Sequence, residues 1–242
     1  MNWKNYKFRC SSLGKIMTDA RAKKDILSET CKDELNAILL RTKDREKDIM
    51  SKYTIKGNLV EENSISLVSS VRGRFLVKNE ERFENEYIAG TPDLINPVED
   101  IKSSWDLQTY AKACVTKDNY WQILGYMWLL GDKQGKLLYC LVNTPEELVE
   151  DELRRLSWKM NMIDTENERY VEASQKLMKN MIFDDIPADQ RLTEFTVEFD
   201  DGKIELLKQR IDVCREYLAS EDFRKQLNSD KYAISVTGGL KF

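Results

Sequence analysis

The feature that most limits the fold of this chain is a continuous apolar segment at residues 136–144, KLLYCLVNT. A strand that is apolar along its whole length is covered on both faces, as strands are in sheets that carry helices on both sides. Patterns of helical spacing precede and follow it. We therefore predict an α/β fold in which helices flank a central mixed β-sheet, followed by a C-terminal helical extension.

The segments before this strand predict helices first and strands later. A serine-capped short helix is expected over 11–21, and two helices with apolar residues at helical spacing over 28–50 and 52–70. Residues 83–103 alternate in polarity and contain a turn at Asn96-Pro97, which predicts consecutive short strands.

One further helix is expected at residues 106–131, where Gly131 ends the pattern. Apolar residues in 146–182 are spaced alternately by four and three, which indicates one long helix or two stacked helices. We favour a helix lying on the core over an oligomer seam. A last helix is predicted over 203–228, before a short extended tail.

We divide the chain into a core at residues 1–145 and a helical extension at 146–242, within one structural domain. The extension either packs on the core or forms subunit contacts. No apolar run approaches the roughly 18–20 residues that a membrane span needs, and the N-terminus carries no signal-peptide core. We therefore expect a cytoplasmic protein without a membrane partner.

The chain contains no histidine. This composition excludes Ser-His-Asp and Cys-His catalysis, HExxH metalloproteases and nucleases that depend on histidine. Its five cysteines are scattered and form no CxxC pair, so neither a zinc site nor an iron–sulfur cluster is expected. A hydrolase of this composition has to work with carboxylates, lysine and a hard metal ion.

Candidate catalytic groups lie in the predicted strands. Asp100 and Lys102 are two apart, so on a strand they project from the same face, while Ile101 points into the core. If the Asn96-Pro97 turn folds the strands together, Asp93 comes close to Asp100. One or two carboxylates and a substrate phosphate are enough to hold Mg²⁺, and phosphodiester cleavage can use such a set. A surface salt bridge is the usual alternative for so short a pattern.

Two neighbouring features strengthen the hypothesis. Glu61 follows Gly57 by four residues on the preceding predicted helix and can add a third carboxylate, although a solvated helix residue is the alternative. Gln122 and Tyr126 share one face of an otherwise apolar helix and need polar partners if they are buried. The alternative is a core tyrosine with the glutamine at the surface.

Arg9, Ser11 and Ser12 precede the first predicted helix, where hydroxyl groups and an arginine suit an anion. A plain serine N-cap is the simpler interpretation of this segment.

Taken in order, these residues resemble the YqaJ-like viral recombinase nucleases, the group within the PD-(D/E)XK superfamily that includes phage lambda exonuclease. The pattern of that family is a serine at a helix start, GxxxE, G-[TV]-x-D, [DE]-x-K and QxxxY. This chain matches it over roughly residues 8–145, at Ser11/Ser12, Gly57 to Glu61, Gly90 to Asp93, Asp100 to Lys102 and Gln122 to Tyr126.

The resemblance implies a restriction-endonuclease-like core and hydrolysis of linear double-stranded DNA with Mg²⁺, for which Mn²⁺ can substitute, without ATP. It also implies 5′ to 3′ digestion that leaves 3′ tails for recombination, a ring-shaped homo-oligomer such as a trimer, a single-strand annealing partner, and a phage or prophage gene in a bacterial host. A non-catalytic DNA- or protein-binding module on the same fold and a structure-specific endonuclease are the alternatives.

By the same resemblance, Asp93, Asp100 and the Ile101 carbonyl would bind the metal, with Glu61 completing its shell. Lys102 would activate the attacking water, and Gln122 and Tyr126 would orient Lys102 or contact the strand. The 5′ phosphate would be held by Arg9, Ser11 and Ser12. Many relatives have Glu in place of Asp100. Related helicase-attached and CRISPR-adaptation nucleases often have His in place of Glu61 and carry a four-cysteine iron–sulfur cluster. This chain has neither feature, which favours the lambda-like branch.

Overall fold

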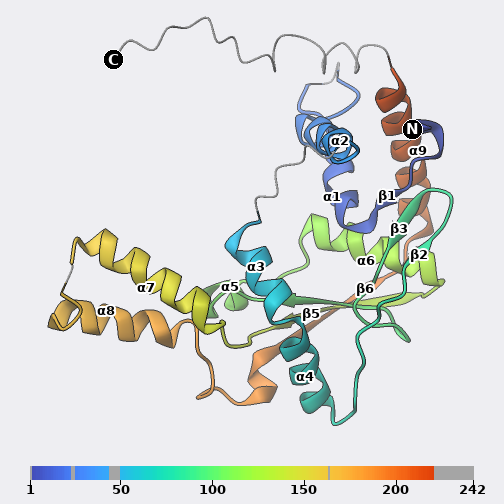
Figure 1. Ribbon diagram of the computed structural model, residues 1–242. Coiled ribbons are helices and arrows are strands. Elements are labelled where there is room, and N and C mark those ends of the chain that lie inside the picture. The colour runs from blue at the N-terminus through green and yellow to red at the C-terminus, as the bar shows by residue number, and fades with distance from the viewer. Residues whose placement is uncertain (1, 23–24, 44–49, 163, 221–242) are drawn as a thin grey trace, which may run out of the picture.

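The computed structural model describes residues 2–22, 25–43, 50–162 and 164–220. Its strands form two three-stranded mixed sheets, ordered β1-β3-β2 and β4-β5-β6, and helices flank both sheets (Figure 1). The predicted α/β class is confirmed. The strands are nevertheless divided between two small sheets, whereas the sequence predicted one central sheet.

The smaller sheet consists of β1 Phe8–Arg9, β2 Phe83–Glu84 and β3 Ile88–Gly90, and the larger of β4 Glu99–Ser103, β5 Gln134–Cys140 and β6 Leu192–Glu198. The helices are α1 Leu13–Ile16, α2 Glu29–Arg41, α3 Lys52–Leu59, α4 Glu61–Arg72, α5 Leu107–Ala111, α6 Lys117–Leu130, α7 Glu146–Met160, α8 Glu168–Lys179 and α9 Asp201–Ala219. Short 3-10 turns lie at Trp3–Asn5, Cys10–Ser12 and Ala188–Arg191.

Strand β5 is the centre of the larger sheet, parallel to β4 and antiparallel to β6. Successive side chains of the strand enter different cores: Leu137 joins the cluster that contains Leu124 of α6, and Leu138 joins the cluster that contains Val68 of α4. Both leucines are fully buried. The prediction of a strand covered on both faces is therefore confirmed, and α6 and α4 are the helices that cover it.

Three predicted helices are shorter or divided in the structure. The helix expected at 52–70 is interrupted at Val60, where α3 ends and α4 begins. The helix expected at 106–131 is two helices, because Thr116 caps α6 separately from α5; Gly131 does end α6, in a left-handed conformation. The serine cap expected for 11–21 is wrong: α1 has four residues, and the Ser12 side chain makes no capping bond.

The region 146–182 forms two helices, the second of the two arrangements left open by the sequence. Helices α7 and α8 pack against each other as a hairpin that extends away from the sheets (Figure 1). Its base joins a core cluster around Trp105, through Leu148 and Val149 of α7 and Met181 just after α8. Trp158, near the far end, is 79% exposed. The division of one domain into 1–145 and 146–242 stays a prediction, but the extension is not wholly helical, since β6 pairs with β5.

The remaining predicted helices agree in position. Helix α2 occupies the first part of 28–50, capped by Ser28, and α9 occupies most of 203–228. Residues 44–49 of the first predicted helix, residues 221–228 of the second and the predicted extended tail lie outside the described residues. Within the part of the chain that the structure describes, no helix has the length and apolar character needed to cross a membrane.

Candidate active site

Strand β4 presents Asp100 and Lys102 on one face, as the two-residue period of a strand predicts. The Lys102 Nζ lies 2.7 Å from Asp100 Oδ2. The Asp100 side chain is 2% exposed, whereas the Lys102 side chain is 29% exposed and reaches the surface. Ile101 between them points into the core beside Leu138. The strand thus buries a carboxylate and leaves its lysine partner accessible.

Asp93 joins this face from the preceding segment. Leu94 and Glu99 form an antiparallel bridge around the Asn96-Pro97 turn, which places Asp93 alongside β4. There its Oδ2 accepts a hydrogen bond of 2.6 Å from the Ile101 amide. The structure therefore brings Asp93, Asp100 and Lys102 together, as the turn predicted.

Gln122 of α6 connects these groups to one another. Its Nε2 donates to Asp100 Oδ1 at 3.2 Å and to the Tyr126 hydroxyl at 3.1 Å, while its Oε1 accepts from Lys102 Nζ at 3.1 Å. Gly90 gives the Tyr126 ring its space, because a Cβ on residue 90 would lie 2.5 Å from the ring. The glutamine–tyrosine pair thus fixes the orientation of both charged groups on β4.

Burial and mutual repulsion dominate the electrostatics of the two aspartates. Burial and the nearby Asp100 charge raise the pKa of Asp93 to about 7. The hydrogen bond from the Ile101 amide and the Lys102 charge act in the opposite direction and lower it. Burial also raises the pKa of Asp100, opposed by Lys102. Burial alone would lower the pKa of Lys102, but the two carboxylates outweigh it and raise that pKa. The free site therefore holds an ammonium ion and carboxyl groups that take up protons readily.

Glu61 lies at the first residue of α4, not on the helix of Gly57 as predicted. Its Oε2 is 2.6 Å from Lys78 Nζ. Its charge raises the pKa of Asp93, so it is an electrostatic neighbour of the centre. Still, in residues 2–22, 25–43, 50–162 and 164–220 no three Asp, Glu or Cys side chains are grouped as metal ligands. Glu61 is held by a lysine, and only the two aspartates are in place together.

The donor set at β4 fits a hard divalent cation. Asp93 and Asp100 bring two carboxylates near each other, and the Lys102 ammonium, 2.7 Å from Asp100 Oδ2, supplies one positive charge beside them. Burial and the Asp100 charge disfavour the ionised form of Asp93, and a divalent cation bound to both carboxylates would offset these effects. Mg²⁺ needs only one or two carboxylates beside water and phosphate. Asp93 and Asp100 would hold it there.

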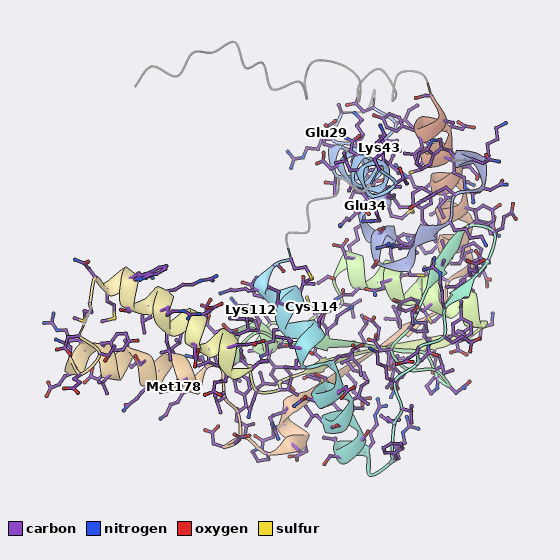
Figure 2. All side chains as sticks on the ribbon, viewed as in Figure 1. Glu29, Glu34, Lys43, Lys112, Cys114 and Met178 are labelled. Atoms are coloured by element: carbon purple, nitrogen blue, oxygen red, sulfur yellow. The ribbon has the colours of Figure 1, made fainter. Side chains whose placement is uncertain are left out.

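The predicted phosphate-binding residues near the N-terminus do not contact this centre in any hydrogen bond of the described residues. Arg9 and Ser11 are exposed. Ser12 is buried, and its hydroxyl donates to Glu34 Oε1 at 2.6 Å, while Lys15 binds the other oxygen at 2.8 Å. Glu34 lies on α2 above α1 (Figure 2). Their role at a 5′ phosphate stays a prediction.

Glu99, which precedes Asp100 on β4, points to the opposite face of the strand, as the two-residue period requires. It is 2% exposed and pairs with Arg72 of α4 at 2.7 Å. The sequence analysis missed Lys78, which binds Glu61, because no local pattern marks a lysine that pairs with a residue seventeen positions earlier.

Comparisons with known proteins agree with this geometry. No family model and no curated protein match the sequence. The structure is similar to a phage related exonuclease from Haemophilus somnus 129PT, with 27% identity and a TM-score of 0.68 over 94% of this chain and 97% of that one. It is also similar to the alkaline exonuclease LHK-Exo from Laribacter hongkongensis, with 12% identity and a TM-score of 0.59 over 95% of this chain and 97% of that one.

A second structure of LHK-Exo, in complex with dAMP, is 12% identical with a TM-score of 0.59 and covers 92% of this chain and 93% of its own. These matches extend through the region after residue 145, which the motifs alone did not cover. The resemblance of this chain to the YqaJ-like phage exonucleases is confirmed along almost its entire length.

Proposed function

We propose that this protein is a divalent-metal-dependent exonuclease that hydrolyses linear double-stranded DNA. The observation that carries the proposal is the meeting of Asp93, Asp100 and Lys102 on one face of β4, each held by a hydrogen bond or an ion pair. The similarity to a solved phage related exonuclease, at 27% identity, supports the choice of reaction. Digestion from the 5′ end with Mg²⁺ or Mn²⁺, a ring-shaped oligomer and a role in phage recombination are the finer parts of the proposal.

Different residues of the site have different roles in the proposed reaction. Asp93 and Asp100 would hold the cation, which when bound would supply charge stabilisation at the phosphate and a water of lowered pKa. Lys102 is an ammonium ion in the free protein, so it orients water or phosphate by donating hydrogen bonds. Lys102 could accept a proton only after losing its own, and the ion pair with Asp100 disfavours that loss. Gln122 keeps Lys102 directed toward the accessible side of the strand.

The test uses purified protein and end-labelled linear duplex with Mg²⁺ and without ATP. We expect degradation by the wild type and at least about a 100-fold lower rate for Lys102→Ala and Asp93→Asn. Lys136→Ala is the control, because Lys136 lies on the opposite side of the sheet in an ion pair with Glu194. Activity of both site variants equal to the wild type would remove the assigned centre.

Two further measurements separate the alternatives. Closed circular duplex stays intact if the enzyme needs an end, and its cleavage would show an endonuclease instead. A calorimetric titration with Mn²⁺ that shows no binding, while DNA still binds, would indicate a non-catalytic binding module.

A further inference from the structure

A second lysine lies at the candidate active site, outside the motifs that the sequence resemblance covers. Helix α4 ends at Arg72 and is capped by Gly73, and the chain then turns back along the helix, where the Leu76 amide donates to Ser69 Oγ. This return brings Lys78 to the first turn of α4. There its Nζ lies 2.6 Å from Glu61 Oε2.

The backbone beside Lys78 is attached to the loop that carries Asp93. The Asn79 amide donates to the Asp93 carbonyl at 2.8 Å, and its side-chain Nδ2 donates to the Pro92 carbonyl at 2.9 Å. Asn79 is 9% exposed. Lys78 therefore stands on a backbone fixed to the same loop as Asp93, unlike a lysine on a free surface segment.

The charged groups near Lys78 include Glu61 and Asp93 of the candidate active site. The bond from Glu61 raises the pKa of Lys78, and Asp93 adds to the effect, so the residue is an ammonium ion at neutral pH. The Lys78 side chain is 40% exposed, which leaves it accessible to a ligand. A divalent cation prefers carboxylate oxygens and would compete with this ammonium for Glu61.

We propose that Lys78 is a phosphate-binding residue of this centre, and that its ion pair with Glu61 is exchangeable. In the free protein the ammonium holds the Glu61 carboxylate. With a divalent cation bound, Glu61 turns to the cation, and Lys78 is released to a phosphate of the DNA strand. This inference rests on the proposed function, because it assigns Lys78 to the same cation and the same DNA.

The variant Lys78→Met tests both halves of the exchange. Without its lysine competitor, Glu61 is available to the cation, and we expect Mn²⁺ to bind about three- to ten-fold more tightly in calorimetry without DNA. In fluorescence anisotropy with a phosphorothioate duplex that resists hydrolysis and Ca²⁺ present, the slope of log affinity against log salt falls by about one, as expected for one lost phosphate contact.

Two further variants make the test specific. Lys136→Met removes an ion pair whose side chains are 35% and 31% exposed, close to the 40% and 29% of Lys78 and Glu61. We expect this variant to change neither the Mn²⁺ affinity nor the salt slope. Lys78→Arg keeps the charge and retains the wild-type salt slope. The proposal requires tighter Mn²⁺ binding and the smaller slope in Lys78→Met; absence of either change overturns it. A wild type that binds Mn²⁺ and duplex but never cleaves would instead overturn the proposed function.

Discussion

The pKa values of two lysines in this protein shift in opposite directions, although burial lowers both. Lys102 at the end of β4 is surrounded by the carboxylates of Asp100 and Asp93, and its pKa is raised although burial opposes this. Lys56 of α3 is fully buried, and its Nζ donates to the Trp105 carbonyl at 2.9 Å. Burial lowers the pKa of Lys56 to about 7, against the opposing charge of Asp106.

The surroundings of Lys56 are aromatic instead of acidic. Its Nζ lies 5.9 Å from the centre of the Trp105 ring and 5.5 Å from that of Phe183. Ring faces attract a cation, but much less than a carboxylate does in the same place. The comparison shows that β4 keeps a positive charge on its accessible side, beside carboxylates that stabilise it. The contact between α3 and Trp105 tolerates a charge at a cost in stability.

The largest effect expected from this comparison is on catalysis. Lys102→Met removes the ammonium from the accessible face of β4, and we expect the rate on linear duplex to fall by about 10²–10⁴. Lys56→Met keeps the length of the side chain and removes a charge that binds the Trp105 carbonyl, not Asp93 or Asp100, so it should retain most of the activity. Equal losses in the two variants, measured as initial rates at saturating Mg²⁺, would contradict the division between the two lysines.

The second effect is on stability as a function of pH. The pKa of Lys56 is about 7 in the folded protein and near 10.5 in the unfolded chain, so unfolding takes up a proton between these values. Wild-type stability should therefore rise with pH in this window, by on the order of 3–4 kcal/mol between pH 7 and 10 relative to Lys56→Met.

Denaturant unfolding at several pH values measures this difference. Lys52→Met is the matched control, because Lys52 lies on the same helix, 4.6 Å from the centre of the Trp105 ring, with its side chain 32% exposed. Its curve should run parallel to that of the wild type. If Lys56→Met also runs parallel, Lys56 is not a buried ammonium that loses its proton near pH 7.

The smallest effect expected is at Gln122, which orients Lys102 and Asp100 without being assigned a proton or a ligand role. Gln122→Ala leaves the two charges paired but free to turn, and we expect about a ten-fold loss in kcat with little change in Mn²⁺ affinity. Steady-state kinetics and calorimetry on the same preparation check both. A loss as large as that of Lys102→Met would mean that Gln122 itself contacts the substrate.

Local geometry explains which parts of the site could be predicted from the sequence. Asp100 and Lys102 on one face, with Glu99 on the other, follow from the two-residue period of a strand. Gln122 and Tyr126 follow from the four-residue spacing of a helix, and they do share a hydrogen bond.

The features that escaped prediction depend on contacts between distant segments. Ser12 was expected to cap a helix, but the buried Glu34 of α2 takes its hydroxyl. Glu61 was placed on the helix of Gly57, yet α3 and α4 separate at Val60 and Lys78 holds the carboxylate. Periodicity describes neighbours along one element, and it carries no information on which element packs against it.

The central claim is that Asp93 and Asp100 share one divalent cation beside Lys102. Diffraction from crystals soaked in Mn²⁺, with data collected at the manganese absorption edge, tests this most directly. We expect an anomalous peak within about 2.0–2.3 Å of an oxygen of each aspartate, and its loss in Asp93→Asn crystals soaked in the same way. Saturated crystals with no peak at this pair, or with Mn²⁺ bound only elsewhere, would contradict the account.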